Sequence, residues 1–268
     1  MKLGPTLRNR RSRKSLLPPF FRTHQQVWIF YRTFMEVLQG DRIAAIFASK
    51  RESEIEVVEQ FLGLLNILMS FPGSTFQSYV SHVVSLTTAI YPLVANTQDF
   101  VHVREAIFQV LYTVLLTHSV SCTEDEQKTI MGIFLASFQQ LSDLSVFKNN
   151  LFFLNDLNKR NRLFSRESIA KNVRPAFLQT LLMLLFGGMH GIVEEDIISF
   201  LFELASLDFA AFYSQVLCGT LSGLTGLSNS QKAQLLALFG QEIDFPTFSR
   251  NCHQMVSQKT LPSRRPKL

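Results

Sequence analysis

The sequence has few of the residues that cross-link or interrupt small folds. Its 268 residues include 3 Cys, 12 Gly and 9 Pro. Cys122, Cys218 and Cys252 are far apart and form no CxxC pair, which excludes a dense disulfide framework and a cysteine-based zinc site. This cysteine usage fits a reducing compartment best. Because turn residues are sparse, we expect long helices rather than many short strands, and therefore an all-α fold.

Long apolar runs are also missing. The longest strongly apolar run, residues 177–186, is about half of the roughly 20 residues that a membrane-spanning helix requires, so we interpret it as a buried helix. The first 21 residues carry charge where a signal peptide needs an apolar segment. The sequence therefore predicts neither membrane insertion nor secretion.

Acidic residues are absent from the first 14 positions, where six basic residues stand. The rest of the chain has 20 basic and 21 acidic residues, which gives no general reason to bind nucleic acid. We expect disordered basic tails over residues 1–20 and 259–268. The first tail has three open interpretations. These are a solvated arm, a loose contact with an anionic polymer, and a nuclear localisation signal formed by Arg8, Arg10, Arg11, Arg13 and Lys14.

The residue patterns of catalysis and of cofactor binding are missing as well. Six His are scattered without metal-ligand spacing, and the glycines of FGGMHG at 186–191 lack the Gly-Lys-Ser/Thr ending of a phosphate loop. Asp208 stands among apolar residues at helical spacing, but no second acid, His or Lys shares its helical face for acid–base chemistry. We interpret Asp208 as the N-cap of a helix after a turn, worth about 1 kcal/mol. The sequence predicts no enzyme, no cofactor and no metal.

What the sequence does contain is a succession of roughly ten amphipathic helical segments joined by short links. Thr123 and Glu126 have the spacing of a capping box, and Asp143 is a candidate cap of the next helix. That next helix carries one apolar face, formed by Val146, Phe147, Leu151, Leu154 and Leu157. The 25 Phe recur at intervals of three and four residues, which favours core packing over a base-stacking platform.

Pairs of neighbouring segments make units of about 40 residues, the period of HEAT and armadillo repeats. The sequence therefore predicts a HEAT-like α-solenoid of paired antiparallel helices over residues 21–258. A compact helical bundle is the alternative that the periodicity leaves open.

Three blocks, residues 145–164, 203–217 and 226–256, resemble the closing segments of karyopherin-β nuclear exportins, in particular those that carry profilin-bound actin. With a weaker likeness at 91–112, the resemblance covers about residues 90–256. It implies a HEAT-repeat superhelix that holds protein cargo, such as profilin–actin, together with the GTPase Ran. It also implies a receptor found in the nucleus and the cytoplasm.

The chain departs from that family in length and in its ending after residue 256. The N-terminal repeats that chiefly grip Ran in the family have no counterpart here, so we expect a fragment, an alternative product or an incomplete gene model with little Ran binding. We also expect self-association through the apolar side of the first helix, near Val27, Phe30 and Phe34. A stand-alone helical scaffold unrelated to transport is the alternative function.

Overall fold

The computed structural model describes residues 29, 32, 41–140, 143–187, 192–240 and 244–260. The chain forms two compact units, residues 1–49 and 50–268. In the first unit, helix α2 spans Asp41–Ser49 and buries Ile43 and Phe47. The predicted first helix, with Val27, Phe30 and Phe34, lies outside the described residues apart from Ile29 and Arg32.

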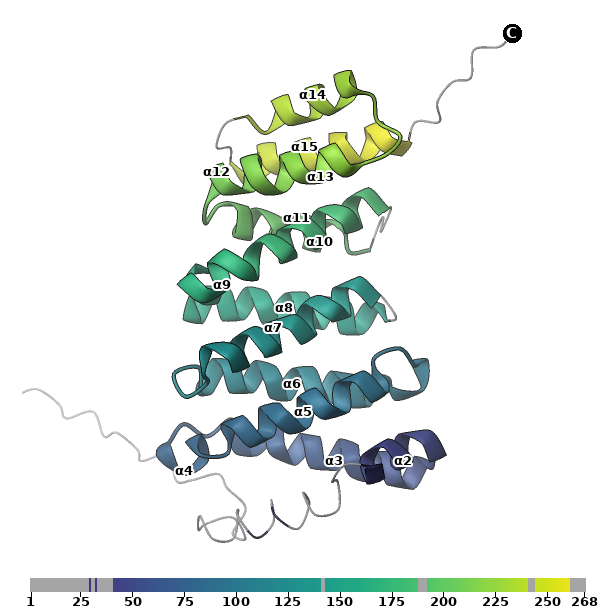
Figure 1. The fold of residues 1–268 in the computed structure, drawn as a ribbon, viewed down its shortest axis with the longest axis vertical. Helices are drawn as coiled ribbons and strands as arrows, with labels where there is room; N and C mark the ends of the chain where they lie inside the picture. The colour runs from purple at the N-terminus through teal and green to yellow at the C-terminus, as the bar shows by residue number, and fades with distance from the viewer. Residues whose placement is uncertain are drawn as a thin grey trace, which may run out of the picture. The chain divides into compact units, whose positions relative to one another are not determined.

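The second unit contains a row of five long helices in which each helix packs on the next (Figure 1). In chain order this first row consists of α3 (Glu52–Met69), α6 (Val101–Thr117), α8 (Leu144–Asn161), α11 (Glu194–Ala205) and α15 (Phe245–Thr260). The row helices begin at residues 52, 101, 144, 194 and 245, so successive starts lie 43 to 51 residues apart. This repeat is somewhat longer than the predicted 40 residues.

A second row packs against the first and has the same order along the chain (Figure 1). It consists of α5 (Val80–Val94), α7 (Glu124–Gln140), α10 (Arg174–Gly187) and a continuous segment of α12 (Phe209–Ala211), the π-helical turn η4 (Phe212–Leu217) and α13 (Cys218–Gly223). Shorter elements join or flank the rows: α4 (Ser74–Gln77), η2 (Gln98–Phe100), η3 (Leu163–Ser165), α9 (Glu167–Asn172) and α14 (Asn229–Leu238). The described residues of the second unit form no strand, and their paired helices make the predicted HEAT-like α-solenoid.

Local capping signals begin several of these helices as the sequence predicts. Thr123 N donates to Glu126 Oε2 at 2.8 Å, and Glu126 N donates to Thr123 Oγ1 at 3.2 Å, which completes the capping box of α7. Asp143 Oδ1 accepts hydrogen bonds from the backbone N–H groups of Ser145 and Val146 at the start of α8. A second capping box, between Ser228 and Gln231, begins α14 and was not predicted.

Aromatic side chains fill the space between the two rows. Phe108 of α6 lies 5.1 Å from Phe134 of α7, measured between ring centroids. Farther along the solenoid, Phe164 of η3 makes edge contacts with Phe177 of α10 and Phe200 of α11. The predicted apolar face of α8 is buried at all five positions, and residues 177–186 lie in α10 with most side chains buried. Most of the described Phe side chains are therefore core residues, as predicted, whereas Phe152 and Phe245 are exposed.

Helix α15 continues to Thr260, two residues into the segment predicted as a tail, and residues 1–20 and 261–268 lie outside the described residues. The bounds of a single solenoid over residues 21–258 stay a prediction.

No single helix in the described part of the chain has the length and apolar character to cross a membrane. The pair Glu194–Ala205 and Phe209–Gly223 meets those two criteria together, with a bend of 114° between its halves.

Candidate protein-binding surface

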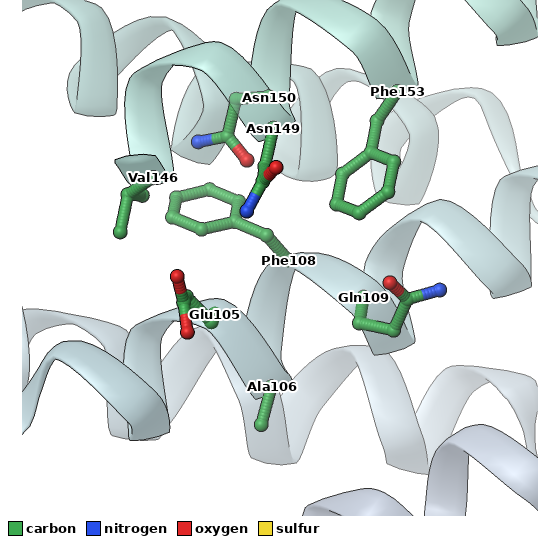
Figure 2. A pocket seen from close by; sticks show the side chains of 8 residues that line it. All are labelled: Glu105, Ala106, Phe108, Gln109, Val146, Asn149, Asn150 and Phe153. Atoms are coloured by element: carbon green, nitrogen blue, oxygen red, sulfur yellow. The ribbon is translucent and has the colours of Figure 1, made fainter. Parts of the chain in front are cut away.

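A groove runs between α6 and α8, two neighbouring helices of the first row (Figure 2). We call it the α6–α8 groove. Its volume is about 290 Å³, and it is lined by Glu105, Ala106, Phe108, Gln109, Val146, Asn149, Asn150 and Phe153. None of these described residues is basic. The groove therefore combines apolar and aromatic walls with one carboxylate and three amide side chains.

Glu105 supplies the negative charge of the α6–α8 groove. Its Oε1 accepts a hydrogen bond from Ser145 Oγ at 3.0 Å, and its Oε2 lies 3.5 Å from His102 Nδ1. The side chain of Glu105 is 32% exposed. Because an ionised carboxylate has about four acceptor positions, both oxygens retain capacity for a further donor.

Asn150 lines this groove and has a buried acceptor without a hydrogen-bond partner among the described residues. The Ser137 hydroxyl donates its only hydrogen to the carbonyl oxygen of Phe134 at 2.6 Å, so it can only accept from Asn150 Nδ2, which lies at 2.9 Å. This contact fixes the orientation of the Asn150 amide, with its nitrogen toward Ser137 and its oxygen away from Ser137. Asn150 is fully buried, and its Oδ1 has no hydrogen-bond partner among the described residues. A buried acceptor without a partner costs about 1–3 kcal/mol, so this atom favours a bound donor.

The aromatic wall of the groove continues along α8. The ring of Phe153 stacks on Tyr112 with a centroid distance of 4.5 Å, and Tyr112 Oη donates to Asp156 Oδ2 at 2.7 Å. Asp156 also pairs with Arg160 Nε at 2.9 Å. The pKa of Tyr112 is raised to about 12, mainly by burial and to a smaller extent by the hydrogen bond to Asp156 and the negative charge of Asp156. The Tyr112 hydroxyl therefore stays a donor at neutral pH. Next to this cluster, Phe152 is 66% exposed.

Asp208 lies at a second cavity, of about 350 Å³, between α9–α10 and the α12–η4 segment. Its Oδ1 accepts a hydrogen bond from Ala211 N at 3.0 Å at the start of α12, and its Oδ2 lies 3.4 Å from Arg174 Nη2. The Arg174 side chain is 12% exposed and that of Asp208 is 46% exposed. The geometry is that of an N-cap in the turn after α11, and its contribution to stability stays a prediction. The ion pair with Arg174 was not predicted.

An acidic cavity of about 740 Å³ lies where the beginnings of α3 and α6 meet. Glu52, Glu56, Glu59 and Asp99 line it, and Lys50 Nζ pairs with Asp99 Oδ2 at 2.5 Å. Glu52, Glu56 and Asp99 are exposed, and Glu59 is half-buried. The geometry of these carboxylates does not indicate a particular ligand.

His253 contacts two adjacent carboxylates, Glu194 and Glu195, which are distant from it in the sequence. His253 Nδ1 lies 2.8 Å from Glu194 Oε1, and His253 Nε2 lies 2.8 Å from Glu195 Oε1. The pKa of the neighbouring Cys252 thiol is raised, mainly by burial and to a smaller extent by the charges of Glu194 and Glu195. The raised pKa keeps that thiol protonated and unreactive. Within the described ranges, no three His, Cys, Asp or Glu side chains are placed to hold a metal ion.

Comparison with known proteins identifies the repeats. The sequence model described as "Exportin-6, C-terminal TPR repeats" matches residues 112–261, more than half of the chain. The chain belongs to this Exportin-6 C-terminal repeat family. Exportin-6 of Danio rerio is 29% identical over 246 residues, that of Dictyostelium discoideum 28% over 227 residues, and that of Homo sapiens 26% over 246 residues. No solved structure gives a significant match.

The Exportin-6 relatives are much longer than this chain. In these alignments 84% of the chain is covered, but only 21–22% of each relative. The family description names TPR repeats, whose usual length is about 34 residues. The spacing of 43 to 51 residues in the first row is nearer to HEAT and armadillo units of about 40–47 residues.

The residues predicted from the sequence as a localisation signal lie outside the described residues of this Exportin-6 relative. They are Arg8, Arg10, Arg11, Arg13 and Lys14. Their role stays a prediction. The α6–α8 groove was missed by sequence reasoning because its polar residues are spread over two helices about 40 residues apart. The α8 side of the groove lies within the matched repeats.

Proposed function

We propose that this chain is the C-terminal part of an exportin-like nuclear transport receptor and that it contributes contacts to a protein cargo of the profilin–actin type. The observation that carries the proposal is the match of residues 112–261 to the Exportin-6 C-terminal repeats. The α-solenoid supports it, because stacked helix pairs present an extended surface suited to protein partners. In this proposal the chain acts through protein contacts without covalent chemistry, and the receptor moves between nucleus and cytoplasm.

The proposal assigns Ran binding mainly to other parts of such a receptor. In the resembled exportins the N-terminal repeats chiefly grip Ran in its GTP form, whereas this chain aligns with about a fifth of each relative. We therefore expect no strong GTP-dependent Ran binding by the isolated chain. Immobilised Ran, loaded with GTP or GDP and offered the purified chain at micromolar concentration, measures this directly. Tight retention on the GTP form alone would contradict the assignment.

Cargo binding is tested with purified profilin–actin complex. The full chain is immobilised on a biosensor, and profilin–actin, profilin alone and actin alone are offered in turn. We expect saturable binding of the complex that exceeds binding of either component. A response to the complex no greater than that of an uncoated sensor would overturn the cargo proposal, while leaving the family membership intact.

A further inference from the structure

We infer that the α6–α8 groove is a subsite for one arginine side chain of a protein partner. The inference deepens the proposed function, since it rests on the chain binding a protein, and it adds the chemistry that the partner must present. Three observations carry it: the charge of the groove, the unpaired acceptor of Asn150, and the aromatic walls.

The charge of the groove selects a cation. Glu105 is its one ionisable group among the eight described lining residues, and no lysine or arginine lines it. Ser145 Oγ donates to one oxygen of Glu105, and His102 Nδ1 lies near the other. The carboxylate is therefore oriented before a ligand arrives. A positively charged side chain complements this wall, whereas an anionic side chain would be repelled.

The acceptors of the groove select a ligand with several donors. Asn150 Oδ1 is buried, unpaired among the described residues and fixed in direction by Ser137. Figure 2 shows the Asn150 amide beside Asn149, with the Glu105 carboxylate on the facing helix. A guanidinium carries five N–H donors in one plane and no acceptor, so it can reach a carboxylate and an amide oxygen together.

The aromatic walls distinguish arginine from lysine. Phe108 and Phe153 both line the groove, and Phe153 is held in place by stacking on Tyr112. A planar guanidinium stacks on aromatic faces and is more weakly hydrated than an ammonium group. A volume of about 290 Å³ is at the lower limit of small-molecule pockets, which fits a single side chain.

The test uses the full chain and a minimal probe, N-acetyl-arginine methylamide. Methyl signals of Ala106 and Val146 report on the groove by nuclear magnetic resonance, and the methyl signals of Val120, which is exposed and does not line the groove, serve as reference. We expect saturable shifts at Ala106 and Val146 with the arginine probe. The uncharged isostere N-acetyl-citrulline methylamide and the lysine analogue should bind several-fold more weakly.

Variants assign the binding to the groove. Glu105→Gln keeps the shape and should weaken the arginine probe about tenfold, because it removes a charge-assisted pair. Glu59→Gln makes the same charge change on α3, at the acidic cavity, and should leave the affinity unchanged. Both variants are compared with the unmodified chain by thermal unfolding to confirm that they fold.

Three results would overturn the subsite: equal or tighter binding of the citrulline or lysine analogue, no saturable shift at Ala106 and Val146, or equal weakening by Glu105→Gln and Glu59→Gln. Failure here is distinguishable from failure of the proposed function. Binding of profilin–actin without binding of the arginine probe rejects only the subsite. Binding of the probe without any binding of profilin–actin supports the subsite and rejects the proposed cargo.

Discussion

Replacing Asp208 by alanine tests how the turn between α11 and α12 is held. The substitution removes the hydrogen bond from Ala211 N to Asp208 Oδ1 and the ion pair with Arg174. Loss of an N-cap costs about 0.5–2 kcal/mol. The ion pair adds about 0.2–1 kcal/mol, a range that already allows for solvent screening, because the Asp208 side chain is nearly half exposed. We therefore expect Asp208→Ala to lower the free energy of unfolding by about 1.5 kcal/mol.

Asp208→Asn separates the two contributions. Asparagine caps helices about as well as aspartate, so this variant keeps the acceptor for Ala211 N and loses the charge that faces Arg174. This variant should lower the free energy of unfolding by about 0.5 kcal/mol, the contribution of a partly exposed ion pair. The measurement is urea unfolding of the three proteins, followed by far-ultraviolet circular dichroism, with the helical spectrum of the folded state unchanged in each.

Either of two results would show that the Asp208 cap does not hold the turn. An Asp208→Ala variant within about 0.3 kcal/mol of the unmodified chain would mean that the cap does not stabilise the turn. If Asp208→Asn is as costly as Asp208→Ala, the pair with Arg174 carries the effect and the cap does not.

Three further predictions concern other parts of the chain. Burial alone would raise the pKa of Asp143, but hydrogen bonds from Ser145 and Val146 outweigh it and lower that pKa. Asp143→Ala should therefore lower the free energy of unfolding by about 1 kcal/mol above pH 4, and this cost should disappear as the pH falls through the lowered pKa. Urea unfolding at several pH values measures it. Phe164→Ala should lower stability by about 3–5 kcal/mol, because the ring is fully buried between two other phenylalanines, and a cost below about 1 kcal/mol in the same assay would contradict its place in the core. Deletion of residues 1–14 should leave the melting temperature nearly unchanged, and unfolding of the shortened chain would make that segment structural.

The sequence predicted those features of the fold that depend on residues close together in the chain. The capping box of Thr123 and Glu126 and the cap at Asp143 are local signals, because donor and acceptor lie within three residues. The capping box of Ser228 and Gln231 has the same spacing and could have been found in the same way. Helix existence and the buried face of α8 follow from apolar periodicity, which is likewise local.

The candidate surface could not be predicted in this way. The direction of Asn150 depends on Ser137 in a different helix, and the pair of Arg174 and Asp208 spans 34 positions in the chain. Such contacts depend on how neighbouring helices cross and on which turns face each other. Periodicity indicates which face of each helix is apolar, but it does not determine which polar residue of one helix meets which residue of the next.

In the proposed function, this chain supplies protein-cargo contacts of an exportin-like receptor and does not bind Ran strongly by itself. The most direct measurement is the affinity of the full chain for profilin–actin, determined with and without saturating Ran in its GTP form. Because coupling between two ligands is reciprocal, a chain that binds only the cargo must show the same affinity in both titrations. We expect saturable binding of profilin–actin with no change on addition of Ran. Binding of profilin–actin that appears only when Ran–GTP is present would contradict it.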